Sequence, residues 1–253
     1  MNRYLIEVAY DGTAFHGSQI QPNANTVQGE LNRALSLLMR EKTSTFGASR
    51  TDEGVHALCN FFHFDSEKEV DVQLAFRLNG ILPSSLAVVK IYQCKTPDFN
   101  ARFAATSRRY RYKIYSKKNP FLQNRAMFFP FRLDFDLLDT AANLILQQKD
   151  FTSFSKKNTQ TKTNFCEIKH CQWRQNAETI EFEIDGNRFL RGMVRGLVAT
   201  QLHLAKGDFL LQDFTTIFEA KDCTKAFFDV PGYGLYLEKI FYPEGQFLPL
   251  LID

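Results

Sequence analysis

A six-residue segment with strict alternation constrains the fold of this chain more than any other feature. Ile180, Phe182 and Ile184 are apolar, and each is followed by an acidic side chain, from Glu181 to Asp185. Successive side chains of a strand point to opposite faces, so this pattern predicts a strand with one face on a core and the other exposed. Half-exposed strands are typical of antiparallel sheets. We therefore expect an antiparallel sheet.

Further strands and helices alternate irregularly along the chain. Period-2 or short apolar runs predict strands at residues 4–10, 43–48, 59–64, 86–92, 111–115 and 234–241. Apolar residues at helical spacing predict helices at 27–38, 71–78, 135–146 and 189–203. This mixture favours the α+β class, with a mainly antiparallel central sheet. We divide the chain into an N-terminal subdomain, residues 1–105, and a C-terminal subdomain, residues 106–253.

Composition argues against several classes of protein. The net charge of +3 is too small to indicate a nucleic-acid binder by itself. The five cysteines contain no C-x-x-C pair, the histidines show no metal-ligand spacing, and no phosphate-binding glycine loop occurs, so no metal or cofactor is expected. No apolar stretch of about 18 residues and no signal sequence is visible, which makes the cytoplasm the expected compartment.

The loop from Ser49 to Ala57 is the strongest candidate for chemistry. Arg50, Asp52, Glu53 and His56 lie within seven residues, between two apolar strands. Catalytic groups are commonly placed on loops held by rigid strands, and a nearby arginine keeps a carboxylate ionised. A solvated turn with surface charges is the alternative that charge content alone favours.

Two arginine-rich segments are candidates for phosphate binding. In a strand, Arg109 and Arg111 share one face while Arg108, Tyr110 and Tyr112 share the other. Arginine binds phosphate oxygens and tyrosine stacks on unpaired bases, although arginine stems covering the edge of a sheet explain the pattern equally well.

The second segment is the helix expected from residue 189. Arg188, Arg191 and Arg195 lie at helical spacing there. This stripe either meets an anion or faces water.

Taken in order, these motifs resemble the TruA family of tRNA pseudouridine synthases over essentially the whole chain. The resemblance is greatest at Arg50-Thr51-Asp52-x-Gly54-Val55-His56-Ala57. It is carried also by the following segments: Tyr10-Asp11-Gly12, Phe15-x-Gly17-x-Gln19, Thr26-Val27-Gln28, Asn79-x-x-Leu82-Pro83, Asp98-Phe99-x-Ala101-Arg102-Phe103, Arg108-Arg109-Tyr110-Arg111-Tyr112, Asp150-Phe151-Thr152-Ser153-Phe154, Phe189-Leu190-x-x-Met193-Val194-Arg195 and Gly234-Leu235-Tyr236-Leu237.

The resemblance implies a pseudouridine synthase fold of two subdomains with a basic cleft between them. It implies a homodimer that converts uridine to pseudouridine in the tRNA anticodon stem-loop, at positions 38 to 40, without metal or cofactor. By position, Asp52 corresponds to the catalytic nucleophile, Tyr110 to the tyrosine that stacks on the target base, and Arg195 to the basic partner of the aspartate. The substrate-binding residues implied are Arg50, Tyr110, Arg108, Arg109, Arg111 and Leu237.

The sequence departs from the family pattern at several positions. Ser18 stands where tryptophan is usual, and Ser49 and Ala199 where glycine is usual. Gly196 stands where asparagine is usual, and Leu58-Cys59 replaces a more polar pair. These changes leave the target uridine open. A tRNA-binding protein without catalysis, and a synthase acting on a different RNA position, are the alternative functions.

Overall fold

The protein is organised as two compact units. The structure, a computed structural model, describes residues 1–157 and 161–250. One unit comprises Met1–Thr106 together with the chain from Leu237 onward, and the other comprises Ser107–Tyr236. The last residues, from Leu237 onward, were predicted to lie in the second half. They belong to the first unit, where the strand at 247–249 pairs with the strand at 86–94.

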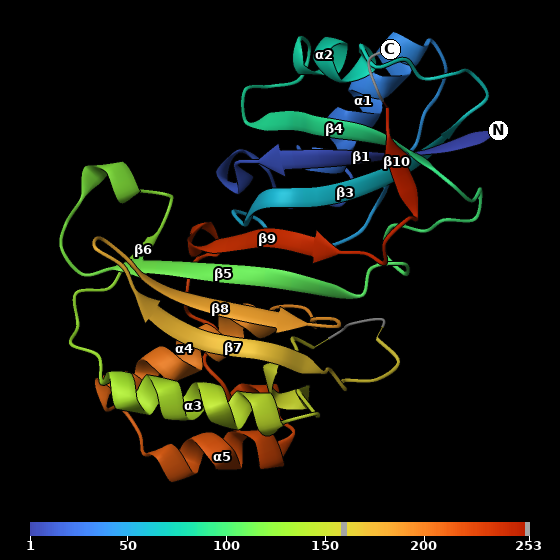
Figure 1. Ribbon diagram of the computed structural model, residues 1–253. Helices are drawn as coiled ribbons and strands as arrows, with labels where there is room; N and C mark the ends of the chain where they lie inside the picture. Colours follow the sequence, from blue (N-terminus) through green and yellow to red (C-terminus); the bar gives the residue numbers. More distant parts are fainter. Residues whose placement is uncertain (158–160, 251–253) are drawn as a thin grey trace. The chain divides into compact units, whose positions relative to one another are not determined.

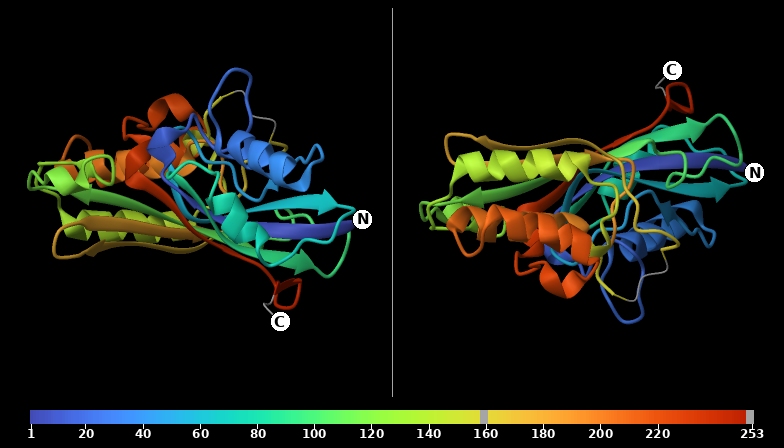
Figure 2. Two further views of the ribbon diagram at one scale, coloured as in Figure 1. Left: turned by 90° about the horizontal axis from the view of Figure 1, so that it is seen from above. Right: turned by 90° about the horizontal axis from the view of Figure 1, so that it is seen from below.

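The first unit is built on an antiparallel sheet with strand order β10-β4-β1-β3-β9 (Figure 1). Figure 2 shows helix α1 on one face of these strands. Thr26 caps α1, since its hydroxyl accepts a hydrogen bond from the Gly29 amide, and the apolar stripe beginning at Val27 is buried. The elements are β1 (Asn2–Tyr10), a 3-10 turn (Gly12–Ala14), α1 (Val27–Met39), β2 (Phe46–Gly47), β3 (His56–Ser66), α2 (Leu74–Asn79), β4 (Leu86–Cys94), β9 (Leu235–Phe241) and β10 (Phe247–Pro249).

The second unit is built on the antiparallel strands β5, β8 and β7, with β6 parallel to β5. Helices α3, α4 and α5 gather beside these strands (Figure 1), and α3 packs against β7 and α4. The elements are β5 (Ser107–Tyr115), β6 (Met127–Phe128), α3 (Phe135–Gln147), β7 (Ile168–Gln175), β8 (Ile180–Gly186), α4 (Met193–Lys206) and α5 (Leu211–Ala220), with 3-10 turns at Pro120–Leu122, Thr152–Phe154, Cys223–Lys225 and Gly232–Gly234. The predicted α+β class, with mainly antiparallel strands, is confirmed.

A buried histidine makes the stability of the first unit sensitive to pH. His63, on β3, is 3% exposed, stacks on Phe46 with ring centroids 5.3 Å apart, and accepts a hydrogen bond from the Ala101 amide at 3.3 Å. Burial, and then the charge of Arg3, lower its pKa to about 4, although Asp65 and the Phe46 backbone act in the opposite direction. The folded protein therefore keeps this imidazole neutral at pH values where the unfolded chain protonates it.

We expect acid to destabilise the wild-type protein more than a His63→Gln variant. Below about pH 6.5 the unfolded state binds a proton that the folded state does not, at a cost of about 1.4 kcal/mol per pH unit. Between pH 6.5 and 5 the wild type should thus lose about 2 kcal/mol more than the variant. Urea unfolding at both pH values measures this difference, with exposed His16→Gln as the control. Parallel pH profiles for wild type and His63→Gln would contradict it.

Candidate active site

The loop that carries Asp52 runs between two strands of the first unit. It leaves β2 at Gly47 and enters β3 at His56. Thr51 is buried, whereas Asp52 is partly exposed and its neighbours Arg50 and Glu53 are exposed. The Val55 amide donates a hydrogen bond to the Asp52 carbonyl at 3.2 Å, which closes a tight turn directly after the aspartate. Asp52 is thus the first residue of this turn, between the buried Thr51 and the exposed Glu53.

Hydrogen bonds from two neighbouring segments hold this loop through Thr51. The Thr51 amide donates to the Ser18 hydroxyl at 2.8 Å, and the Ser18 amide donates to the Thr51 carbonyl at 3.1 Å. The Tyr10 and Thr51 hydroxyls are 2.9 Å apart. Asn60, buried on β3, donates to the Tyr10 hydroxyl and to the Ser49 carbonyl. Ser18 therefore takes part in positioning the residue next to Asp52, which a tryptophan side chain has no acceptor to do.

Two glycines let the segment at residues 11–18 lie against the loop. A Cβ at Gly12 would lie 2.0 Å from the Val55 carbonyl oxygen, which is far inside contact distance. Gly17 has φ +95°, a conformation that side chains rarely adopt, and a Cβ there would lie 3.0 Å from the Thr51 carbonyl. Backbone therefore packs directly on backbone at both ends of the Asp52 turn.

His56 fixes the end of the loop. Its buried ring accepts a hydrogen bond from the Gly12 amide at Nδ1, 3.1 Å away, and the same nitrogen lies 3.2 Å from the Asp11 carboxylate. The role found for His56 in this unit is thus to tie the loop to the segment that directly follows β1. Arg50 has no polar partner among residues 1–157 and 161–250, so its guanidinium group is available for a ligand.

The two tyrosines of β5 differ in what surrounds them. Tyr110 is 6% exposed and packs edge-to-face on Phe189, with ring centroids 5.1 Å apart. Tyr112 is fully buried, and its hydroxyl donates to the Pro231 carbonyl at 2.9 Å. Burial raises the pKa of Tyr112. Tyr112 is therefore a core residue whose hydroxyl is already used within the second unit.

Arg195 lies in the first turn of α4, and the carbonyl of Val230 orients it. The Arg195 guanidinium donates to this oxygen from Nε at 2.9 Å and from a terminal nitrogen at 2.6 Å. The predicted start of this helix near residue 189 was wrong. Gly192, with φ +75°, forms the N-cap, so α4 begins at Met193 and Arg188 and Arg191 precede it. The expected stripe of three arginines on one helical face does not form.

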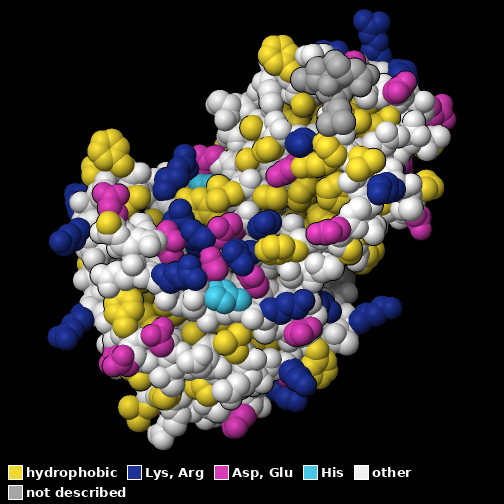
Figure 3. Space-filling view, in the orientation of Figure 1, with side chains coloured by type: hydrophobic (Ala, Val, Ile, Leu, Met, Phe, Trp, Pro, Cys, Tyr) yellow, Lys and Arg dark blue, Asp and Glu magenta, His cyan; other side chains and the backbone are white. Residues whose placement is uncertain are grey.

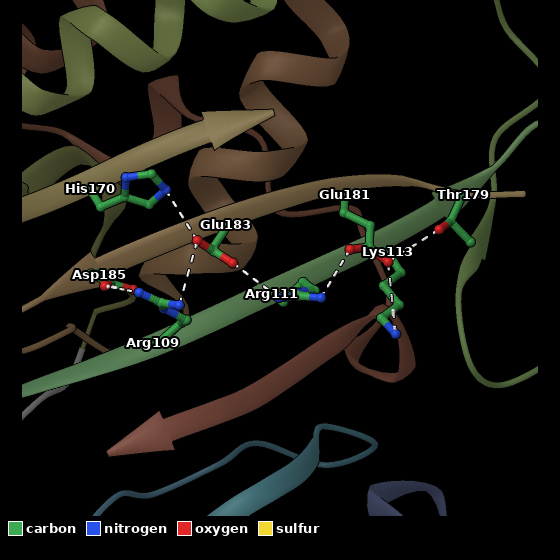
Figure 4. A network of polar contacts seen from close by, with 8 residues as sticks. All are labelled: Arg109, Arg111, Lys113, His170, Thr179, Glu181, Glu183 and Asp185. Carbon is green, nitrogen blue, oxygen red and sulfur yellow. Dashed lines mark hydrogen bonds and ion pairs between the residues drawn. The ribbon is translucent and has the colours of Figure 1, made fainter. Parts of the chain in front are cut away.

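The arginines on the outer face of β5 already have carboxylate partners (Figure 4). Arg109 makes two hydrogen bonds of 2.8 Å with Asp185, directly opposite on β8. Arg111 bonds Glu183 at 3.0 Å and Glu181 at 3.1 Å, and Glu183 also lies 3.1 Å from His170. Figure 3 shows basic and acidic side chains interspersed on one face of the second unit.

This ladder differs from the exposed acidic face that the sequence predicts for residues 180–185. Glu183 and Asp185 are buried under the arginine side chains. The alternation of β8 is present as predicted, but its acidic face pairs with the basic face of β5 instead of with water. The cause is the register, which sets Arg109 opposite Asp185 and Arg111 opposite Glu183.

The remaining candidate residues are buried. Arg108 points to the opposite face of β5 and donates to the Asn187 carbonyl at 2.9 Å. Leu237, on β9, is fully buried in the first unit. Asp52 belongs to the first unit, whereas Tyr110 and Arg195 belong to the second, so the meeting of these three side chains stays a prediction.

The described residues form neither a cluster suited to a metal ion nor a membrane-spanning helix. Among residues 1–157 and 161–250, no group of three or more histidine, cysteine, aspartate or glutamate side chains is arranged to hold a metal ion. In the same part of the chain, no helix has the length and apolar character needed to cross a membrane.

Known proteins with similar sequences match nearly the whole chain. The sequence model of a family described as tRNA pseudouridine synthase matches residues 6–104 and 141–243. The chain is 44% identical over 249 residues to tRNA pseudouridine synthase A of Parabacteroides distasonis, with 98% of each chain covered. It is 42% identical over 251 residues to the protein of that name from Bacteroides thetaiotaomicron, covering 98% of this chain and 93% of the relative. It is 35% identical over 240 residues to tRNA pseudouridine synthase A of Bacillus pumilus, covering 93% of this chain and 97% of the relative.

Proposed function

Because the chain belongs to the tRNA pseudouridine synthase family, we propose that it uses Asp52 to isomerise uridine in the anticodon stem-loop of tRNA, at positions 38 to 40. It is an isomerase that converts uridine of tRNA to pseudouridine. The observation that carries the assignment to Asp52 is the construction of its loop. Thr51 and His56 are both held by buried hydrogen bonds, while the aspartate between them stays partly exposed.

The reaction explains why a carboxylate at such a place is useful. The bond between ribose C1′ and base N1 must break, the base must turn, and C1′ must bond to C5, which then loses its proton. Asp52 can attack C1′, attack C6 of the base, or take a proton from the sugar, and each route needs an ionised carboxylate in a fixed position. A loop with rigid flanks supplies that position without further reorganisation.

The other residues complete the proposal. Arg195 pairs with Asp52 and supplies the charge that a desolvated carboxylate needs. Tyr110 stacks on the flipped uridine, since a base must leave the helical stack before it can be isomerised. Arg50, which has no polar partner among the described residues, contacts a phosphate or displaces the base.

The other expected binding residues have less freedom to meet RNA. For Arg109 and Arg111, phosphate contact requires that they share or exchange their carboxylate partners. Arg108 and Leu237 are buried, so they support the site from within. The homodimer implied by the resemblance and the cytoplasmic location expected from the sequence composition stay predictions.

Two phenylalanine substitutions distinguish the roles of the neighbouring tyrosines. Tyr110→Phe keeps the ring and should bind tRNA normally, but it should turn over at least about a hundredfold more slowly if the hydroxyl moves a proton. Tyr112→Phe loses the hydrogen bond to Pro231 and should cost about 1 kcal/mol of stability while leaving turnover nearly unchanged. Single-turnover rates and urea unfolding of both variants measure these effects. A slower reaction in Tyr112→Phe than in Tyr110→Phe would show that the active-site tyrosine is misassigned.

The proposed activity is tested with tRNA that carries tritium at C5 of its uridines. Tritium is released to water only when C5 forms the new bond to the sugar and loses its hydrogen. The purified protein should release tritium from whole tRNA and from an isolated anticodon stem-loop. Tight binding of both RNAs without tritium release would instead support a tRNA-binding protein without catalysis.

A further inference from the structure

The first unit has a pocket beside the Asp52 loop, and Arg50 is its one lining residue to which the proposed function gives a role. Its volume is about 220 Å³, and Phe46, Phe103, Arg50, Asn100 and Gln19 are among the residues that line it. Drug-sized ligands occupy pockets of about 300–1,000 Å³, so this pocket suits a single small planar group. None of the described residues that line it is acidic.

Two exposed aromatic rings form walls of the pocket. Phe46 is 57% exposed and Phe103 is 78% exposed. The ring of Phe46 is fixed from behind by its stack on the neutral His63. His63 also accepts the hydrogen bond from the Ala101 amide, so one buried ring holds both the strand that carries Phe46 and the loop that carries Phe103. The walls are therefore anchored to a common support.

Polar groups at the pocket suit the edge of a base and its phosphate. The side-chain oxygen Oδ1 of Asn100 accepts hydrogen bonds from the Arg102 and Phe103 amides, and the side-chain NH₂ group of Asn100 has no partner in the described part of the chain. The Gln19 side chain is likewise unpaired there. The guanidinium carbon of Arg102 lies 5.6 Å from the centroid of the Phe103 ring.

From these features we infer that the pocket holds an unpaired nucleobase of the substrate RNA, distinct from the uridine that is isomerised. The base stacks on Phe103 and Phe46, amides of Asn100 and Gln19 meet its edge, and Arg50 meets the adjoining phosphate. The inference rests on the proposed function, because it takes the ligand to be RNA. Arg50 lines the pocket and precedes Asp52 by only two residues, so we place this base close to the target in the same RNA.

The test is binding of an anticodon stem-loop RNA to three single variants of the full chain. Phe103→Ala should weaken binding about 5- to 150-fold, the loss expected when one base–aromatic stack is removed. Phe103→Trp keeps an aromatic face and should bind like wild type. Phe76→Ala removes another phenylalanine of the first unit with a similar exposure, 77%, and should have no effect.

Fluorescence locates the base. With 2-aminopurine placed at one unpaired loop position at a time, one position should be quenched on binding to wild type and to Phe103→Trp, and not on binding to Phe103→Ala. The inference would be overturned if Phe103→Ala bound the RNA as tightly as wild type, or if the quenching did not depend on residue 103. If the inference fails but the protein still releases tritium, the proposed function stands. If quenching depends on Phe103 but no tritium is released, the catalytic proposal fails and the inference stands.

Discussion

Asp52→Asn is expected to lower pseudouridine formation by on the order of 10⁴- to 10⁶-fold, as removal of a catalytic nucleophile does in other enzymes. The amide has nearly the shape of the carboxylate, but it neither attacks carbon nor accepts a proton from the sugar. The hydrogen bonds described above hold the loop through Thr51, Ser49 and His56, so the backbone should remain in place. Affinity for tRNA should therefore stay within a few-fold of wild type.

Tritium release and filter binding measure the two properties on the same preparations. Glu53→Gln is the matched control, because it neutralises the adjacent, exposed carboxylate of the same loop. It should retain wild-type turnover. An Asp52→Asn variant that turns over within tenfold of wild type would exclude Asp52 as the nucleophile.

Gly12→Ala is expected to damage both stability and activity, although residue 12 would touch no substrate in our proposal. The added Cβ would lie 2.0 Å from the Val55 carbonyl oxygen. The oxygen is a backbone atom and the Cβ is bonded directly to the backbone, so no side-chain rotation can separate them. Forcing an extra methyl group into a packed site typically costs about 1–3 kcal/mol. Relief of the clash must move the Asp52 turn, and a displacement of about 1 Å in a catalytic group costs about a hundredfold in rate.

The control for this substitution is Gly80→Ala, at the end of α2. Its backbone φ is −72°, and the nearest atom to the added Cβ, the Arg77 carbonyl oxygen, is at ordinary contact distance, 3.4 Å. Stability should change there by less than about 1 kcal/mol. Urea unfolding and single-turnover rates compare the two variants. Wild-type turnover in Gly12→Ala would show that the packing of residues 11–18 does not position the loop.

The parts of the fold that sequence predicts best are those with local causes. The alternation at residues 180–185 and the apolar stripe from Val27 each reflect one face of one element against a core, and both elements are present. The start of α4 was missed because Gly192 in the left-handed conformation stops the helix from extending back through otherwise favourable residues.

The ion pairing between β5 and β8 is the larger feature that was not predicted from the sequence. Basic residues alternate at 109, 111 and 113 on one strand, and acidic residues alternate at 181, 183 and 185 on another. These two patterns have the same period and opposite charge, which was a readable sign that they face each other. Considered separately, one suggested phosphate binding and the other an exposed face. Only the register of β5 against β8 turns them into the ion-pair ladder.

The contacts around Asp52 also depend on residues that are distant in the sequence. The motif from Arg50 to His56 identifies the loop, but nothing in its spacing indicates that Ser18, Tyr10 and Asn60 hold it. Those contacts join positions 33, 41 and 50 residues apart. Ser18, which departs from the family pattern, supplies the acceptor for the Thr51 amide.

Mapping of pseudouridine in tRNA from cells that lack this protein tests the central claim most directly. The account predicts that pseudouridine disappears at positions 38 to 40 and nowhere else in tRNA, and that it returns with the wild-type gene but not with Asp52→Asn. Unchanged modification at these positions, or restoration by Asp52→Asn, would contradict the account.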